Sequence, residues 1–287
     1  MDTKETYILP EEHSRTARVI GIAGIKRLED THVAVFGVGG VGGHCAEALA
    51  RAGIGQITLV DGDVVSLSNI NRQAVALHST VGRSKVEVMA ERIRDINPRC
   101  LVTALHTYYL PDTVDIEALR VENFDYIADC VDSVVAKVQL AVLCQQKEIP
   151  LISAMAAGNK IYPERFTVTD LFKTNTDPLA KVMRRELRAR GVSRLTVVCS
   201  DEVPVPVSPE TVVSDNTEAP HVRPAPGSIS FVPAVMGMIM AGEIIRSLSG
   251  IAEAQKAEEE ARRLAEVERQ MQATQKRRSG KGQTMQP

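Results

Sequence analysis

The segment that constrains the fold most is the glycine-rich turn that follows the apolar run HVAVF at 32–36. Gly37, Gly39 and Gly42 have the spacing GxGxxG, and a stretch with helical periodicity follows them directly. A strand, a glycine turn and a helix in this order can hold phosphate, because backbone N–H groups and the helix dipole face the anion. Asp61 ends the next apolar run, about 20 residues further on, where a carboxylate can accept both ribose hydroxyls. This acid favours a nucleotide site over the alternative, a tight turn that only packs a helix on a sheet.

Apolar runs that alternate with amphipathic stretches indicate an α/β fold. Strands are expected at 32–36, 57–60, 101–105, 125–130 and 150–153, and helices at 41–52, 83–96 and 134–147. Continuous apolar strands between helices are typical of a Rossmann-like, doubly wound sheet that is mainly parallel and covered on both faces. A C-terminal extension should add strands from RFTVTDL and RLTVV, a basic helix over 177–190 and an apolar helix that ends near 249.

The chain is expected to divide into a domain over 1–250 and a charged tail over 251–287. The tail is nearly free of bulky apolar side chains, so we expect it to be partly helical and mostly mobile. The most apolar run, FVPAVMGMIMAG at 231–242, is shorter than the roughly 20 residues of a membrane-spanning helix. We therefore expect a buried helix there and no integral membrane segment.

Charge and cysteine usage narrow the function classes further. The 34 basic and 36 acidic residues give a formal net charge of −2, so any nucleic-acid-binding surface must be local. The five cysteines form no CxxC pair for zinc and follow no secretory leader, which favours a reducing, cytoplasmic location. Cys199 has apolar neighbours before it and no adjacent histidine, so we interpret it as a buried structural thiol. His32 and His44 are expected to be packed or surface residues rather than bases.

Polar side chains crowd the segment just past Asp61. They are Asp63, Asn69, Arg72 and Gln73, followed by Lys85. A triphosphate under attack needs positive charge on its oxygens, and arginine makes planar bidentate contacts with phosphate. A dinucleotide needs no such cations near its nicotinamide end. ATP is therefore favoured over NAD, while an NAD-linked oxidoreductase and a nucleotide-sensing scaffold without activity are the alternatives from other classes.

Two acids lie in IADCVDS, at the carboxyl end of the expected fourth strand and beside the crevice where open α/β sheets bind ligands. A carboxylate there can hold Mg²⁺ against phosphates, directly or through water. Aspartate is also a favoured N-cap, so these acids could instead cap the following helix. We favour Asp132 as the magnesium ligand and leave both roles open for Asp129.

The order and spacing of these motifs resemble the ThiF/MoeB/HesA group, relatives of the adenylating domain of ubiquitin-activating enzymes. The motifs are GVGGVG, Asp61, SNINRQ at 68–73, Lys85 and CVDS. Members of that group are dimers that adenylate a carboxylate with Mg-ATP. The resemblance implies that Gly39 and Gly40 line the phosphates and that Asp61 holds the ribose. It also implies that three side chains act on the phosphates and one on Mg²⁺, namely Asn69, Arg72, Lys85 and Asp132.

The second half, from SAMAAGNK to GSISFVPAVMGMIMAGEII, is similar to the tRNA threonylcarbamoyladenosine dehydratases within this group. These enzymes cyclise the threonylcarbamoyl group on the adenosine next to the anticodon. A free carboxylate has no usable leaving group, transfer to AMP supplies one, and the substrate's own carbamoyl group can then close the ring. The resemblance implies an ATP-dependent enzyme of the ligase type that acts on tRNA. Adenylation of a ubiquitin-like sulfur carrier is the alternative within this chemistry, and docking of a sulfur-relay protein stays open.

The stretch KVMRRELRARGVSR at 181–194 has six basic residues against one acid. At helical spacing, four of them share one face across which a phosphate backbone could lie, namely Lys181, Arg184, Arg185 and Arg188. A solvated helix face is the commoner role of a charge run. The implied tRNA substrate favours RNA binding instead.

The segment HSRTARVIG at 13–21 carries Arg15 and Arg18 ahead of the glycine turn. In the dimers that this chain resembles, an N-terminal arginine enters the ATP site of the partner, which implies a homodimer here. Arg15 is favoured because SRT lies where that motif has its arginine. Arg18 in the same role, or a plain surface arginine, is the alternative.

Overall fold

The computed structural model describes residues 7–109, 120–207 and 226–281, and a seven-stranded sheet lies at its centre. The strands are β1 His32–Phe36, β2 Gln56–Val60, β3 Leu101–Leu105, β4 Tyr126–Asp129, β5 Leu151–Ala154, β6 Phe166–Asp170 and β7 Thr196–Ser200. Their order is β3-β2-β1-β4-β5-β7-β6, and neighbours run parallel except β6 and β7, which pair antiparallel. The expected doubly wound, mainly parallel sheet is confirmed.

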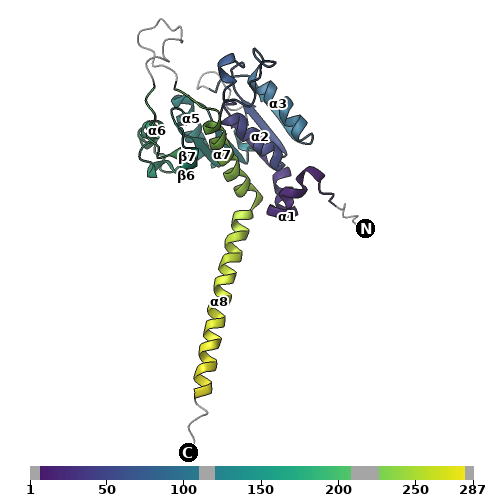
Figure 1. Cartoon of the computed structure of the whole chain (residues 1–287), viewed down its shortest axis with the longest axis vertical. Coiled ribbons are helices and arrows are strands. Elements are labelled where there is room, and N and C mark those ends of the chain that lie inside the picture. Colours follow the sequence, from purple (N-terminus) through teal and green to yellow (C-terminus); the bar gives the residue numbers. More distant parts are fainter. Residues whose placement is uncertain (1–6, 110–119, 208–225, 282–287) are drawn as a thin grey trace, which may run out of the picture.

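Helices cover both faces of this sheet (Figure 1). They are α1 Ser14–Glu29, α2 Gly42–Ala52, α3 Lys85–Ile96, α5 Val134–Lys147, α6 Pro178–Arg188 and α7 Phe231–Ser249, while a last helix, α8 Ile251–Lys281, extends beyond them. Successive side chains of β1 point to opposite faces, so Val33 and Val35 join the core under α2, α3 and α7. Ala34 and Phe36 join the core under α5 and α6. This alternation explains why a strand buried on both faces reads as a continuous apolar run.

The strand order reverses at β1, which pairs with β2 on one side and with β4 on the other. A crevice for ligands forms at such a switch point, outside the carboxyl ends of the strands. The loops after β1 and β4 touch here, since Cys130 N donates to Phe36 O at 2.8 Å. The glycine turn and the segment with Asp132 are therefore neighbours at this switch point.

The apolar helix α7 is a core helix of this domain. Its 19 residues are long and apolar enough to cross a membrane by length and composition alone. Met236, Met240 and Ile244 are fully buried, however, and belong to the core under α2. A Cβ added at Gly237 would lie 2.3 Å from Val41 O, so α7 crosses the start of α2 in close contact. Its apolar composition follows from this packing, as expected for a buried helix.

Two helices differ from the sequence expectations. Residues 14–29 form α1, which the sequence reading did not assign, and the helix is interrupted at Gly21 by a φ of 75°. Residues 251–281 form α8, a helix that leads away from the sheet (Figure 1), where only partial helicity was expected. Its Ala, Glu and Arg residues have high helix propensity, and Arg262 pairs with Glu258 one turn away.

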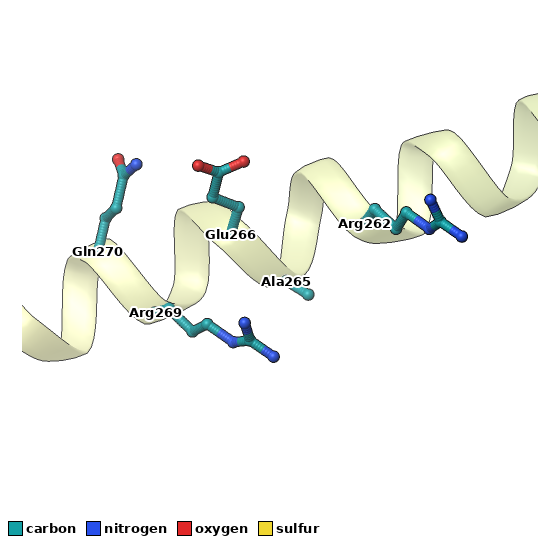
Figure 2. A pocket seen from close by; sticks show the side chains of 5 residues that line it. All are labelled: Arg262, Ala265, Glu266, Arg269 and Gln270. Carbon is teal, nitrogen blue, oxygen red and sulfur yellow. The ribbon is translucent and has the colours of Figure 1, made fainter.

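A shallow hollow occurs on α8 but has no link to the crevice. Figure 2 shows its lining, which comes from this helix alone and consists of Arg262, Ala265, Glu266, Arg269 and Gln270. A hollow with walls from a single helix cannot enclose a ligand, because no second element closes over it. The functional site is therefore sought at the switch point of the sheet.

Candidate active site

The glycine turn contains two glycines that the fold itself requires. Gly37 has a φ of 85°, and a Cβ there would lie 2.7 Å from Cys130 O. A Cβ at Gly42 would lie 1.8 Å from Gly37 O. Both distances are far below van der Waals contact, so any side chain would separate α2 from the sheet or β1 from β4. These two positions explain the turn without any ligand.

Gly39 is different, because the protein leaves room above it. Its φ is negative, and an added Cβ would meet only Gln73 Nε2, at 3.8 Å. Gln73 is 8% exposed, and its buried Oε1 has no partner among the described residues. Val41, the N-cap of α2, offers no side-chain hydrogen bond to the first turn of that helix. An open glycine beside a helix start that no side chain caps fits a phosphate chain.

The start of α7 forms a wall of this turn that the sequence reading missed. A Cβ at Gly40 would lie 3.3 Å from two ring atoms of Pro233 and 3.5 Å from Arg72 Cγ. Asn71 Nδ2 also donates to Ser228 O at 2.9 Å, just before α7. No local pattern predicts the contacts of this turn with α7, since more than half of the chain separates the partners in sequence.

Asp61 binds the glycine turn directly. Its Oδ2 accepts the N–H of Val38 at 2.6 Å, and its Oδ1 accepts the N–H of Asp63 at 2.8 Å. The carboxylate thus fixes the turn against the end of β2. Each oxygen has a second lone pair, so the predicted contact with ribose hydroxyls stays compatible with this geometry.

Lys85 and Asp63 form a partly buried ion pair at the carboxyl edge of the sheet. Lys85 Nζ lies 2.7 Å from Asp63 Oδ2, and Tyr108 donates to Asp63 Oδ1 at 2.7 Å. Burial works to raise the pKa of Asp63, but the hydrogen bonds from Lys85 and Tyr108 outweigh it and the pKa is lowered. Tyr108 follows β3, and its contact with Asp63 depends on β2 and β3 becoming neighbours in the sheet.

The segment SNINRQ folds back beside the turn. Asn69 is buried and its Oδ1 accepts the N–H of Ser66 at 3.1 Å, which stabilises the short 3₁₀ helix Leu67–Asn69. Arg72 Nη1 donates to Ser68 O at 3.0 Å and to Asn71 Oδ1 at 2.9 Å. The Cγ of Arg72 thus lies beside Gly40, while its guanidinium is held by Ser68 and Asn71.

Asp132 and Asp129 have different environments. Asp132 is exposed and makes no hydrogen bond or ion pair with the described residues. Asp129 is fully buried and pairs with Lys137 at 3.1 Å. The pKa of Tyr108 is raised, first by its hydrogen bond to Asp63 and further by the charges of Asp61 and Asp132. The charge of Asp132 thus acts on Tyr108 together with those of the two acids after β2.

Within the described parts of the chain, no cluster of three metal-binding side chains occurs. A single carboxylate with phosphate oxygens and water is, however, a common way to bind Mg²⁺. Asp132, exposed and without a hydrogen-bond or ion-pair partner among the described residues, fits that arrangement.

The basic helix α6 exposes most of the cations predicted to contact RNA. Lys181, Arg185 and Arg188 are exposed, with Arg185 paired to Glu186 at 2.8 Å. Arg184 is half-buried and donates to the hydroxyl of Thr174. The described helix therefore presents three of the four predicted side chains to solvent, and RNA binding stays a prediction.

Cys199 and Arg15 lie away from the glycine turn. Cys199 is buried, and burial raises the pKa of its thiol to about 11. Arg15 is exposed near the start of α1. His13, two residues earlier, lies against Gly53, where an added Cβ would be 2.9 Å from its ring. Gly53 ends α2 at the opposite end from the glycine turn, about 16 Å away for a helix of this length.

Comparisons with known proteins match these features. The sequence model of the ThiF family matches residues 13–283. The tRNA threonylcarbamoyladenosine dehydratase of Bacillus subtilis is 44% identical over 241 residues, which are 83% of this chain and 94% of that protein. The protein of that name from Escherichia coli is 47% identical over 174 residues, which are 61% of this chain and 64% of that protein.

A solved structure has the same fold. It is the E. coli tRNA N6-threonylcarbamoyladenosine dehydratase TcdA in complex with ATP, with a TM-score of 0.75 and 35% sequence identity. The match covers 87% of this chain and 100% of that one.

Proposed function

This chain belongs to the ThiF family, and from that premise we propose that it is an ATP-dependent tRNA threonylcarbamoyladenosine dehydratase. The observation that carries the proposal is the 44% identity to the Bacillus dehydratase over 94% of that protein's length, which includes the half beyond the nucleotide site. The ATP complex of the E. coli relative, with 35% identity, supports ATP over NAD as the nucleotide.

The reaction proceeds in two transfers. A carboxylate oxygen of the threonylcarbamoyl group attacks the α-phosphorus of ATP, which forms an acyl-adenylate and expels pyrophosphate. The carbamoyl group of the same substrate then attacks the activated carbonyl carbon, loses its proton, and expels AMP as the ring closes. Both leaving groups come from ATP, so no protein nucleophile is required, in agreement with the buried thiol of Cys199.

Different residues of the site bind the phosphates, the ribose and the metal ion in these transfers. The open turn at Gly39 and the uncapped start of α2 bind the phosphates, while Asp61 accepts the ribose hydroxyls. Lys85 and Arg72 stabilise the charge that develops on the phosphate oxygens, with Asn69 and Gln73 as further polar partners. Asp132 holds Mg²⁺, which would neutralise phosphate charge when bound.

The decisive assay is mass spectrometry of tRNA nucleosides after incubation of substrate tRNA with protein and ATP. Cyclised threonylcarbamoyladenosine is expected only with ATP. Asp132→Asn and Arg72→Ala should fold normally and lose activity by about a hundredfold or more. Arg51→Ala, which removes an exposed arginine at the far end of α2, is the matched control and should keep full activity. If ATP–pyrophosphate exchange appears only when a small carrier protein is added, the sulfur-carrier alternative is correct instead.

We propose further that the enzyme is a cytoplasmic homodimer whose sites are completed by Arg15 of the partner subunit. About 16 Å separates the two ends of α2, and the start of α1 lies at the end away from the glycine turn. An arginine side chain cannot span that distance within its own subunit. A mixture of Arg15→Ala and Arg72→Ala chains should therefore regain about a quarter of wild-type activity through mixed dimers, each with one intact site. Mixed dimers without activity would mean that Arg15 acts in its own subunit or not at all.

A further inference from the structure

We infer that Lys137 is a positioning residue that holds the loop carrying Asp132 in register with the end of β5. The inference deepens the proposed function, since it concerns the same site. Lys137 makes no contact with the crevice itself. Its effect on a bound nucleotide would come entirely through the loop over 130–133.

The ammonium group of Lys137 joins two neighbouring strands. Nζ lies 3.1 Å from Asp129 Oδ2, 3.3 Å from Ser153 Oγ and 2.7 Å from Ala154 O. The three side chains of Lys137, Asp129 and Ser153 are 1%, 0% and 0% exposed. Asp129 ends β4 and Ala154 ends β5, so one buried cation ties the carboxyl ends of both strands together.

The carboxylate of Asp129 has no capacity left for a metal. Its Oδ2 accepts the hydroxyl of Ser153 at 2.5 Å, and its Oδ1 accepts the N–H of Val131 at 3.2 Å. Both oxygens also accept from Lys137. The sequence left Asp129 open between a metal ligand and a cap, and the structure assigns it a third role, as the buried partner of Lys137.

This ion pair closes the base of the loop that contains Asp132. The loop begins at Asp129 and ends at Ser133, the N-cap of α5, whose Oγ accepts the N–H of Ala136 at 3.4 Å. Lys137 lies in the first turn of α5 and reaches back to Asp129. Both ends of the loop are thus fixed by hydrogen bonds, with the exposed carboxylate of Asp132 between them.

Stability alone does not account for a buried ion pair of this kind. Apolar side chains of similar volume are often as stable or more stable, because burying two charges costs much of what their attraction contributes. A second fully buried pair, Lys160 and Asp177 at 2.7 Å, lies in the same domain. It connects the loop after β5 to the N-cap of α6 and makes no contact with the Asp132 loop. Lys160 is therefore a matched control for the loss of a buried ammonium.

The test measures nucleotide binding, so it does not depend on tRNA turnover. A non-hydrolysable ATP analogue is titrated by calorimetry into full-length wild type and variants, with and without Mg²⁺. Mg²⁺ should tighten analogue binding to wild type and to Lys160→Met. Lys137→Met and Asp132→Asn should each lose about tenfold or more of that gain. The double variant Asp132→Asn/Lys137→Met should lose no more than Asp132→Asn alone, since both substitutions act on one carboxylate.

Three results would overturn the inference. The first is an equal gain from Mg²⁺ in Lys137→Met and wild type, and the second is the absence of any gain in wild type. The third is an equal loss in Lys160→Met, which would show a general effect of unpairing a buried acid.

If Lys137→Met does not fold, Ser153→Ala removes only the hydroxyl donor to Asp129. It should lose part of the gain, and a wild-type response would again overturn the inference. A wild type that binds Mg-nucleotide but does not cyclise tRNA would refute the proposed function. The effect of Lys137→Met on nucleotide binding could still be interpreted in that case.

Discussion

Replacing Gly39 by alanine should separate folding from nucleotide binding. An added Cβ meets nothing closer than Gln73 Nε2 at 3.8 Å, and the negative φ suits alanine. Because alanine restricts the unfolded chain, the free energy of unfolding should rise by about 0.4–1 kcal/mol. The same methyl group fills the space of a phosphate oxygen. Loss of one charge-assisted hydrogen bond costs about 1.5–3 kcal/mol, so the Kd for ATP should rise by roughly ten- to a hundredfold.

Gly42→Ala provides the contrast within the same turn. Its Cβ would lie 1.8 Å from Gly37 O and 3.0 Å from Cys130 Cβ, so α2 must move away from the sheet. The free energy of unfolding should fall by about 1–3 kcal/mol or more. Urea unfolding gives the stability of both variants, and calorimetry with an ATP analogue gives the affinity.

The two glycines should thus change stability in opposite directions. A Gly39→Ala protein that binds ATP like wild type would falsify the assignment of the phosphate site. A Gly39→Ala protein that is less stable than wild type would show that the turn is already crowded at this position, contrary to the 3.8 Å clearance in the structure.

Three further predictions concern other parts of the molecule. Cys199→Ser should keep activity within about twofold in the nucleoside assay, because burial holds the thiol protonated with a pKa of about 11; a hundredfold loss would indicate a covalent intermediate. Charge reversal of Lys181, Arg185 and Arg188 should weaken tRNA binding and flatten its salt dependence by about one unit per lost phosphate contact, with ATP affinity unchanged; unchanged tRNA affinity would make α6 a solvated face. Burial, with a smaller contribution from nearby positive charge, lowers the pKa of His13, so the unfolded chain binds its proton more readily and stability should fall as the pH drops below about 6.5. His13→Gln should reduce that slope in urea titrations from pH 7.5 to 5.5, and an identical slope would exclude this histidine as its source.

Local patterns predicted most of the sheet and the glycine turn. Strands such as His32–Phe36 are buried on both faces, so their apolar runs are unbroken, and the helices between them repeat every three to four residues. The spacing of Gly37, Gly39 and Gly42, directly after a strand and before a helix, also predicts a turn between these two elements. α1 was missed because Gly21 interrupts its pattern, and α8 was underestimated because apolar content says little about helix propensity.

Side-chain partners across the sheet could not be predicted from the sequence. The contact of Pro233 with the turn, the hydrogen bond of Tyr108 to Asp63 and the burial of Lys137 all depend on which strands become neighbours. The spacing of charged residues along the chain predicts which of them share a helix face, but not which partners their side chains contact. Arg184, for example, shares the helical face expected for RNA contacts and yet donates to Thr174.

The crossing of α7 over the start of α2 has a consequence for how the protein is made. Pro233 and Gly237 contact a turn that is synthesised almost two hundred residues earlier. A ribosome releases the strand and glycine turn first, but the wall beside Gly40 can form only after the chain has been extended past α7. Such long-range contacts form late in folding. A translation product that ends before α7 therefore lacks one wall of the phosphate-binding turn. Such an incomplete chain should not bind the nucleotide that the full-length enzyme uses.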